Sequence, residues 1–494
     1  MRYQIRRTDR AKGGTALQQN ATQSNAPSSS APSSSVPSTA VQAAQGVADR
    51  AAGVFWGWSK TRGSERGRIL SDMAEVLTAE REALVHIAAQ EVGAAPQWVD
   101  FNISIAQQTL LQARDLIPLL ADRAVVHADA RRSVVRRQAV GVVLGFVPWN
   151  APIALAARAV AAPLACGNTV ALIASEHCPK THALLGNLFE KAGLPKHVVG
   201  VVTNDASHSL EVARALIAHP TIRRVTFTGS TRVGQIVAIE AAQHLKRCVL
   251  ELSGKAPLIV LQDADIAAAA AAAMTGAFFN QGQVCISTER IIVLDAVADA
   301  FVAALIEKSR RLTAADPRVA PASLGRLITA DAAMRVSGLV QDALEHGATL
   351  CLGGQTDGAV MQPTILDHVT PKMRIYGEES FGPVASVIRV RTEDEAVSVA
   401  NDTAYGLAAS VFGADEARCL DIADRLETGI CQINGPTIFD DPTMPFGGMK
   451  ASGYGRFGGT AALDEFTEIR WLSQHRALDA AQIEDMLNLG RTDA

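Results

Sequence analysis

One thiol of this sequence stands where the chain makes an unusual turn. The segment FNQGQVC (279–285) follows the alanine-rich run 267–273 and presents Cys285 beside small and polar residues. A cysteine thiolate is a strong nucleophile, and on an accessible loop it can attack a carbonyl carbon. A lone cysteine is more often a small buried hydrophobic residue, so a catalytic assignment of Cys285 needs support from other groups.

Two further polar side chains suit reactions at a carbonyl carbon. Glu251 lies in the apolar run 248–252, where burial raises the pKa of a carboxyl group toward the range of a general base. Asn150, in the segment PWNAP (148–152), can donate a hydrogen bond from an uncharged amide to an oxyanion. Each has an ordinary alternative, which is a surface acid on an edge strand for Glu251 and a helix cap for Asn150.

Two segments have features of nucleotide-binding sites. In FTGSTRVG (227–234), Gly229 permits a tight turn and Ser230 can cap the following helix, whose free N–H groups attract an anion. The segment matches neither GxGxxG nor GxxxxGK[ST], and an ordinary capped turn explains it equally well. Glu176 follows the predicted strand 169–173 and is suited to accept hydrogen bonds from ribose hydroxyls, or to be a first-turn acid of a helix.

Short β-branched runs alternate with helical stretches from about residue 140 onward. The pattern predicts strands at 141–147, 169–173, 198–202, 224–228, 248–252, 258–261 and 290–294, with an exposed strand at 132–138 before them. It predicts helices at 154–162, 184–192, 210–219, 230–244 and 297–312. This alternation is typical of an α/β fold with a doubly wound parallel sheet, on which ligands bind beyond the carboxyl ends of the strands. Besides Cys285, the four other candidate groups therefore also lie at strand ends or loops of one protein, which favours covalent acyl chemistry with a nucleotide.

The composition bounds the class of protein. The 494 residues suffice for two or three domains, and a net charge of −4 with 19% charged residues predicts a soluble globular protein without a nucleic-acid footprint. The seven cysteines have no CxxC spacing, so neither a disulfide framework nor a metal site is expected. Free cysteines indicate a reducing compartment, and a cytoplasmic location is therefore expected. No apolar run is long enough for a membrane span.

The N-terminal 45 residues differ from the rest in composition. They are rich in Ser, Ala, Gln and Pro, and carry Arg6, Arg7 and Arg10. Such a segment has too little apolar surface to fold, so a disordered tail is favoured over an organellar transit peptide, whose amphipathic arginine helix is not evident.

Six short motifs together resemble the NAD(P)-dependent aldehyde dehydrogenases. They are PWN (148–150), FTGS (227–230), ELSGK (251–255), GQVC (282–285), ESFGP (379–383) and PFGG (445–448), and they occur in the family's order within residues 46–475. The segments CISTER (285–290), VPWNAP (147–152) and MPFGGMKASGYGRFGG (444–459) are most similar to the vanillin, salicylaldehyde and benzaldehyde dehydrogenase branch. The resemblance implies oxidation of an aldehyde, of the aromatic kind met in aromatic compound degradation, to the carboxylic acid.

The resemblance also implies a domain organisation. An NAD-binding domain would comprise residues 46–123 and 140–252, and a second α/β catalytic domain residues 253–452. Residues 124–139 and 453–476 would form a small β oligomerisation arm with the C-terminal strand, giving a homodimer or homotetramer, and 477–494 a C-terminal tail.

Carried onto this sequence, the family's motifs imply roles for individual residues. Cys285 would be the nucleophile, with Asn150 and the Cys285 backbone N–H holding the oxyanion of a thiohemiacetal. After hydride transfer to the nicotinamide, Glu251 would activate the water that hydrolyses the thioester. NAD, in preference to NADP, would be bound by Val147, Trp149, Glu176, Gly229, Ser230, Gly234, Leu252, Glu379 and Phe381.

The sequence departs from the family's pattern at four positions. Ile173 stands where the family usually has a lysine that grips the adenosine ribose, so NAD would bind more weakly or differently. Ala159 and Phe457 stand where many relatives have Lys and Glu, so a proton-relay pair is absent. Ser253 replaces the usual Gly near the nicotinamide.

The substrate class follows from the same resemblance. The presence of Glu251 disfavours a CoA-acylating enzyme, and the segment after Cys285 lacks the arginine-bearing pattern of succinate-semialdehyde enzymes. Ile286, Phe101 and Phe439 are expected to line an apolar slot. Arg158 is expected either to steer a phenolic oxygen or, with more weight, to make a structural ion pair.

Three alternative functions remain open on the sequence. The first is an aliphatic aldehyde dehydrogenase, and the second is a binding or structural relative with weakened catalysis, for which Ile173 is the best argument. A Cys–His hydrolase is the most remote, because no histidine is clearly paired with Cys285.

Overall fold

The computed structural model of the chain describes residues 38–127, 132–203 and 206–474. Most of the predicted N-terminal tail and all of the predicted C-terminal tail (477–494) lie outside these residues. The predicted tail boundary at residue 45 is wrong, because helix α1 (Thr39–Ser59) begins at Thr39. The helix forms there because Val41, Ala44, Ala48 and Ala51 recur every three or four residues and are buried as one face. The start of this pattern directly follows the Ser- and Pro-rich residues, and composition alone therefore assigned it to the tail.

A six-stranded sheet carries the strands predicted between residues 141 and 252. Its order is β19-β7-β6-β3-β4-β5, and all neighbours are parallel except β19. The strands are β3 (Val142–Phe146), β4 (Thr169–Ile173), β5 (Val199–Val202), β6 (Ile222–Thr228), β7 (Arg247–Glu251) and β19 (Gly453–Tyr454). The chain adds β4 and β5 on one side of β3, and then β6 and β7 on the other. This reversal creates a switch point beyond the carboxyl end of β3, where such sheets bind ligands.

Helices cover both faces of this sheet, so the predicted doubly wound arrangement is confirmed. On one face, α5 (Pro152–Ala165) and α6 (Pro179–Lys191) contact the sheet; α2 (Gly63–Ala79) packs on both of these helices, and α4 (Pro96–Leu116) packs on α5. The other packs against α1, α7 (Ser209–Ala218) and α8 (Thr231–Gln243). Every residue of α5 is buried, because this helix lies between the sheet and α4 and has no solvent face.

A second sheet of seven strands follows in the sequence. Its order is β10-β13-β14-β9-β8-β16-β17, with only β10 antiparallel to its neighbour. The strands are β8 (Ala256–Val260), β9 (Thr288–Leu294), β10 (Thr349–Leu352), β13 (Thr364–Asp367), β14 (Val384–Val390), β16 (Ala408–Phe412) and β17 (Ile430–Ile433). The helices α9 (Ile266–Phe278) and α10 (Asp295–Ser309) pack on one face, and α11 (Ala330–Glu345), α13 (Glu393–Asn401) and α14 (Glu416–Asp424) on the other. Burial on both faces accounts for the Ile and Val residues of the central strands β8, β9 and β14.

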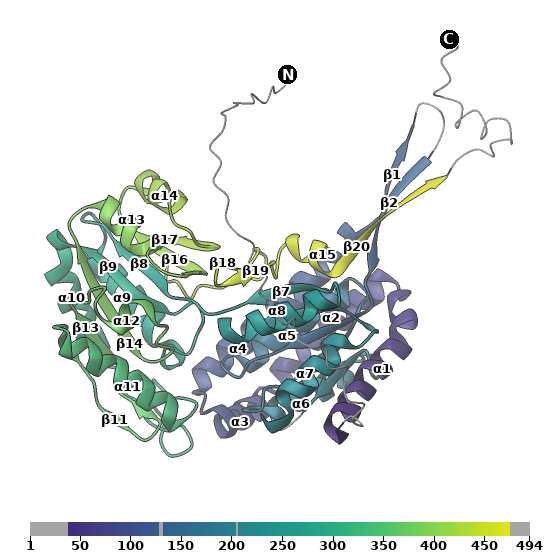
Figure 1. Cartoon of the computed structure of the whole chain (residues 1–494), viewed down its shortest axis with the longest axis horizontal. Helices are drawn as coiled ribbons and strands as arrows, with labels where there is room; N and C mark the ends of the chain where they lie inside the picture. Colours follow the sequence, from purple (N-terminus) through teal and green to yellow (C-terminus); the bar gives the residue numbers. More distant parts are fainter. Residues whose placement is uncertain (1–37, 128–131, 204–205, 475–494) are drawn as a thin grey trace, which may run out of the picture. The chain divides into compact units, whose positions relative to one another are not determined.

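A third, antiparallel sheet joins distant parts of the chain and is called here the arm sheet. It consists of β1 (Arg123–Val126), β2 (Arg132–Ala139) and β20 (Thr467–Gln474), which lie side by side in Figure 1. The predicted exposed strand 132–138 is therefore present as β2, with Val135 opposite Trp471 of β20. With the two parallel sheets, the arm sheet completes the predicted fold class.

The remaining elements are short and mostly lie in connections. They are α3 (Arg81–Val92), α12 (Arg374–Gly377), α15 (Ala461–Phe466), β11 (Thr356–Asp357), β12 (Val360–Met361), β15 (Tyr405–Gly406) and β18 (Met449–Lys450), with 3-10 turns at Ile117–Leu120, Ala206–His208 and Phe279–Gly282.

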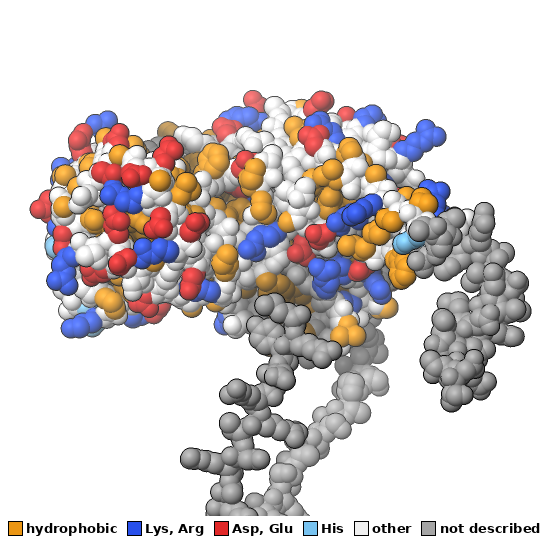
Figure 2. All heavy atoms as spheres, turned by 90° about the horizontal axis from the view of Figure 1, so that it is seen from above, with side chains coloured by type: hydrophobic (Ala, Val, Ile, Leu, Met, Phe, Trp, Pro, Cys, Tyr) orange, Lys and Arg blue, Asp and Glu red, His pale blue; other side chains and the backbone are white. Residues whose placement is uncertain are grey.

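The described surface is mixed in charge. In Figure 2 the acidic and basic side chains alternate across the face in view, without a broad field of one sign among the described residues there. None of the helices in the described part of the chain is both long and apolar enough to cross a bilayer.

Candidate active site

The carboxyl ends of β3, β6 and β7 surround a cavity of about 290 Å³, called here the helix-end cavity because α8 begins at its wall. It is lined by Pro148, Trp149, Asn150, Thr228, Gly229, Ser230, Glu251, Leu252, Ser253, Cys285, Arg335, Glu379 and Phe381. The structure thus gathers all three predicted catalytic residues and most of the predicted cofactor residues around one space.

Three predicted cofactor residues do not line this cavity. Val147 is buried behind it, with its N–H donated to the carbonyl of Ile173 at 3.2 Å. Gly234 also lies behind the wall, where a Cβ would stand 2.4 Å from Leu252 Cδ2, so a larger residue would have to displace the Leu252 side chain. Glu176 is half-exposed just beyond β4. The ring of the next residue, His177, lies nearly perpendicular to the Trp149 ring, with 6.1 Å between the two ring centres.

The loop before Cys285 is strained and firmly held. Asn280, Gln281 and Gly282 follow one another at φ values of 50°, 55° and 68°, which non-glycine residues adopt only when their surroundings enforce them. The side-chain amide of Gln281 accepts from the Gly325 N–H at 2.8 Å and donates to the Arg326 carbonyl at 3.1 Å. The polar turn seen in the sequence is therefore a set of hydrogen-bonding groups that fixes the position of the thiol.

Cys285 itself is partly exposed, and its surroundings disfavour the thiolate. Burial raises the pKa of the Cys285 thiol, and the charge of Glu251 raises it further, while Arg158 opposes both effects. The thiol form is therefore favoured at rest, and its proton must leave before the sulfur can attack a carbonyl carbon.

The amide of Asn150 is fixed by contacts at both ends of the residue. Its Nδ2 donates to the Gln283 carbonyl at 3.0 Å, and its backbone carbonyl accepts from Trp98 Nε1 at 2.8 Å and Asn280 Nδ2 at 3.1 Å. The capping alternative is wrong, because Ala151 occupies the cap position of α5 and no side chain caps it. One Nδ2 hydrogen remains for a developing oxyanion near Cys285.

Glu251 is a buried carboxyl at the end of β7. The alternative of a surface acid on an edge strand is wrong, because β19 pairs with β7 there and only 2% of the residue is exposed. Burial raises the pKa of Glu251 to about 8, although the charges of Arg158 and Arg456 lower it. Its Oε1 has no hydrogen-bond partner among the described residues, so this oxygen is free to accept a proton from water.

A second, smaller cavity lies on the other side of Cys285 and is called here the aromatic cavity. It measures about 40 Å³ and is lined by Trp98, Phe101, Asn102, Ile105, Asn150, Ala151, Ala154, Leu155, Arg158, Val284, Cys285, Ile286, Ile438, Asp440 and Phe446. The expected lining by Phe101 and Ile286 is confirmed. The expected lining by Phe439 is wrong, because 57% of that residue is exposed and its neighbour Ile438 turns inward instead.

A buried ion pair stands in the wall of the aromatic cavity. Arg158 Nη2 donates to Asp440 Oδ2, and the guanidinium lies over the ring of Phe446, 4.1 Å from its centre. The ion-pair interpretation of Arg158 is therefore confirmed. Asp440 Oδ1 has no hydrogen-bond partner among the described residues and so keeps an acceptor at this wall.

Two residues of the site carry no signal in the sequence. Arg335 of α11 donates from Nη1 to the Glu379 carbonyl at 3.1 Å and from Nη2 to the Ser380 carbonyl. Trp98 of α4 lines the aromatic cavity and orients Asn150. Both are ordinary residues of amphipathic helices until the tertiary structure places them. The described residues contain no group of three His, Cys, Asp or Glu side chains that could hold a metal ion.

Comparison with known proteins agrees with this geometry. Residues 15–472 match the model of the aldehyde dehydrogenase family. The vanillin dehydrogenase of Pseudomonas fluorescens is 47% identical over 435 residues, covering 88% of this chain and 90% of the relative. A succinate-semialdehyde dehydrogenase [NADP(+)] of Deinococcus radiodurans is 38% identical over 85% of this chain and 88% of the relative.

Solved structures give the same result. The crystal structure of a salicylaldehyde dehydrogenase from Pseudomonas putida G7, complexed with salicylaldehyde, superposes with a TM-score of 0.87 at 45% identity, covering 89% of this chain and 91% of that one. From its matched sequence and its fold, the chain belongs to the aldehyde dehydrogenase family and is an oxidoreductase that acts on aldehydes.

Proposed function

We propose that this protein oxidises an aromatic aldehyde to its carboxylic acid, with NAD as the hydride acceptor and Cys285 as the nucleophile. The observation that carries the proposal is the position of Cys285, which lines both the helix-end cavity and the aromatic cavity. A thiol at that junction can reach an aldehyde from one side and a nicotinamide ring from the other.

The side chains around the thiol supply the remaining steps. The Cys285 thiol first loses its proton to solvent water, and the thiolate then attacks the aldehyde carbon, while Asn150 Nδ2 with the Cys285 backbone N–H holds the oxyanion. When bound, the nicotinamide accepts the hydride of the thiohemiacetal. Glu251 then takes a proton from the water that attacks the thioester, which releases the acid and restores the thiol.

The residues of the helix-end cavity fit a dinucleotide. The Ser230 side chain caps α8 by accepting from the Val233 N–H, and the N-terminus of this helix offers N–H groups and a positive dipole end to a pyrophosphate. Trp149 and Phe381 stand edge to face, 5.8 Å apart, and supply flat apolar surface beside the nucleophile.

The aromatic cavity supports an aromatic substrate. Trp98, Phe101 and Phe446 form apolar walls, and relatives are named for vanillin and salicylaldehyde. Aromatic walls favour a flat ring through offset or edge contacts.

The test is NAD(P)H formation by the purified protein with salicylaldehyde, vanillin, benzaldehyde and hexanal, each with NAD and with NADP. The proposal expects the highest kcat/KM with an aromatic aldehyde and NAD. A preference for hexanal would contradict the aromatic assignment alone. No reduction of either cofactor with any of the aldehydes would contradict the activity.

The preference for NAD over NADP is argued from Glu176. Its carboxylate lies half-exposed beyond β4, and a carboxylate there would accept hydrogen bonds from ribose hydroxyls and repel a 2′-phosphate, which supports NAD. Ile173 ends β4, where a lysine would give the ribose a second partner.

The substitution Ile173→Lys is therefore expected to lower the Kd for NAD about tenfold, the effect of one added hydrogen bond from a charged group. Isothermal titration calorimetry measures the Kd directly. Ile173→Met keeps the apolar bulk without charge and is expected to bind NAD as the parent does. An unchanged Kd in Ile173→Lys would show that the ribose lies away from residue 173.

We also propose the domain organisation and assembly expected from the sequence. Because α1 begins at Thr39, residues 39–123 and 140–252 would form the NAD-binding domain, 253–452 the catalytic domain, and 124–139 with 453–476 the arm. Ile469 and Trp471 of the arm sheet are 64% and 67% exposed, which suits a surface covered in a homodimer or homotetramer. Light scattering gives the mass in solution, and a monomer would contradict this assembly. The seven free thiols support a cytoplasmic location.

A further inference from the structure

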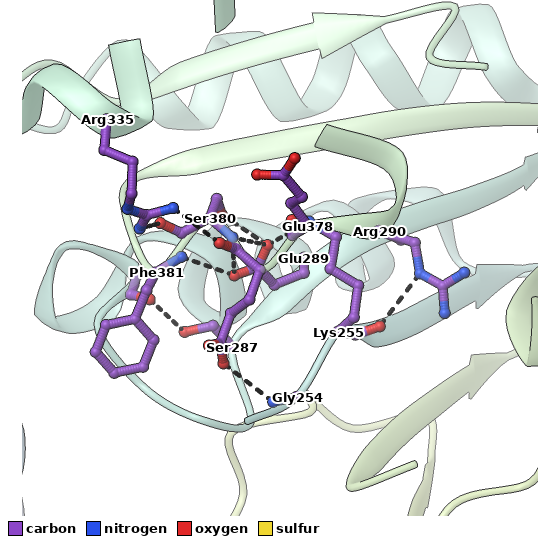
Figure 3. Close-up of polar contacts among 11 residues, drawn as sticks. Gly254, Lys255, Ser287, Glu289, Arg290, Arg335, Glu378, Ser380 and Phe381 are labelled. Atoms are coloured by element: carbon purple, nitrogen blue, oxygen red, sulfur yellow. Dashed lines mark hydrogen bonds and ion pairs between the residues drawn. The ribbon is translucent and has the colours of Figure 1, made fainter. Parts of the chain in front are cut away.

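A buried carboxylate outside the proposed catalytic groups holds the loop that carries Glu379 and Phe381. Glu289 accepts hydrogen bonds from Lys255 Nζ at 2.6 Å, from Ser380 Oγ at 2.6 Å, from the Ser380 N–H at 2.9 Å and from the Phe381 N–H at 3.0 Å. Figure 3 shows Lys255 and the loop around Ser380 converging on this carboxylate. Only 4% of Glu289 and 1% of Lys255 are exposed, so these hydrogen bonds are shielded from water.

The loop needs such a partner because its backbone is strained. Phe381 has a φ of 46°, in the left-handed region that a bulky side chain rarely adopts. This conformation directs its N–H to Glu289 and its ring toward Trp149, at the wall of the helix-end cavity. A residue keeps a strained conformation only where several surrounding contacts hold it there. Glu289 supplies the buried contacts that hold Phe381.

Other contacts tie the same loop to the catalytic segments. Glu379 Oε1 accepts from the Gly254 N–H at 3.0 Å, and Arg335 holds the loop carbonyls from the outside. Lys255 and Gly254 follow Glu251 closely in the chain, and Glu289 follows Cys285 in the same way. The Glu289 network therefore links the loop to both segments that carry the reacting groups.

Glu289 is suited to this role because it is ionised. Burial acts to raise the pKa of Glu289, but the charge of Lys255 and the hydrogen bonds from Lys255, Ser380 and Phe381 outweigh it and hold the pKa below its ordinary value. A carboxylate that accepts from several donors orients them more strongly than a neutral group.

We propose that Glu289 is a positioning residue for hydride transfer: its carboxylate holds the strained Phe381 loop and thereby sets the place of the nicotinamide relative to Cys285. The inference rests on the proposed function. It predicts that loss of the carboxylate impairs the steps that use the dinucleotide and spares those that do not.

The test compares two reactions of one active site. Aldehyde oxidation needs the dinucleotide, whereas hydrolysis of 4-nitrophenyl acetate uses Cys285, Asn150 and Glu251 without it, through attack of the thiolate on the ester, loss of 4-nitrophenolate and hydrolysis of the acetyl thioester. Glu289→Gln is expected to raise the KM and the calorimetric Kd for NAD about tenfold and to lower kcat for oxidation. Ester hydrolysis is expected to stay within about twofold of the parent.

A second variant covers the case in which Glu289→Gln folds poorly. Ser380→Ala removes one hydroxyl donor and leaves the ion pair intact, so it is expected to shift the Kd for NAD in the same direction by a smaller factor, about threefold.

The matched control is Asp367→Asn, at the end of β13 in the same sheet. Asp367 is also a buried carboxylate and pairs with Arg389 at 2.7 Å, but it lines neither cavity around Cys285. This variant is expected to lower the Tm as Glu289→Gln does and to leave the Kd for NAD unchanged.

The outcomes separate the inference from the proposed function. Equal losses of oxidation and ester hydrolysis in Glu289→Gln, or an unchanged Kd and KM for NAD, would overturn the positioning role. A parent protein that binds neither NAD nor NADP in the calorimeter would overturn the proposed function and the inference with it.

Discussion

Replacing Cys285 with alanine is expected to abolish aldehyde oxidation, with a loss on the order of 10⁴-fold or more in kcat. Alanine lacks the thiol that lies at the junction of the two cavities, and no other cysteine lines either of them. The same variant is expected to lose ester hydrolysis, because both reactions begin with attack by this thiol. The Kd for NAD is expected to stay close to that of the parent, since Cys285 has no proposed contact with the phosphates or ribose.

The measurement is NADH formation and 4-nitrophenolate release, each beside the variant Cys351→Ala. Cys351 is also a partly exposed free thiol, but it lies on β10 and lines neither cavity around Cys285, so its removal is expected to leave both rates unchanged. Substantial oxidation by Cys285→Ala would mean that hydride leaves a hydrated aldehyde without a covalent intermediate. Loss of NAD binding in this variant would instead indicate a damaged fold.

Replacing Glu251 with glutamine is expected to stop the reaction after the first half. The amide keeps the shape of the buried side chain but cannot take a proton from water, so thioester hydrolysis should slow by about 10² to 10⁴-fold. Attack by Cys285 does not require this base for its first turnover. Rapid mixing with 4-nitrophenyl acetate is therefore expected to give a burst of about one 4-nitrophenolate per active site, followed by very slow turnover. A variant without the burst would place Glu251 in activation of the thiol rather than in hydrolysis.

The pH dependence gives an independent check on Glu251. Because burial raises its pKa to about 8, only about a tenth of the molecules hold the ionised base at pH 7. The rate of thioester hydrolysis should therefore rise with pH up to about 8 and then level off, since the ionised form is the active one. In Glu251→Gln this rise should be lost, although titration of the Cys285 thiol remains. An identical profile in parent and variant would assign the rise to the thiol alone.

The predicted positions of most strands agree with the structure for a simple physical reason. Strands such as β4 and β8 are covered by helices on both faces, so nearly every side chain is apolar and the run is visible in the sequence. The misplaced boundary at α1 shows the limit of composition, because the alanines from Ala44 onward form a buried face only through the sheet that they pack against.

The chemical types of the reacting groups were likewise readable from the sequence. Thiol, carboxyl and amide chemistry belongs to Cys285, Glu251 and Asn150 as residue types, and the order of the motifs around them indicated the family. Their ordinary alternatives could be rejected only in three dimensions. Glu251 is not a surface acid on an edge strand, because β19 pairs with β7 there. Asn150 is not a helix cap, because its side-chain amide donates to the Gln283 carbonyl.

The sequence by itself therefore determined the α/β fold class, through local periodicity, and the family, through its ordered motifs, from which Cys285 and Glu251 are proposed as the nucleophile and its base. Tertiary structure alone decided which side chains share a wall. Asn150 and Gln283 are separated by 133 positions, Glu289 and Ser380 by 91, and Arg158 and Asp440 by 282. No local pattern encodes such pairings, because they arise from the packing of one sheet's connections against those of another, and that packing placed Arg335, Trp98 and Glu289 around the reacting groups.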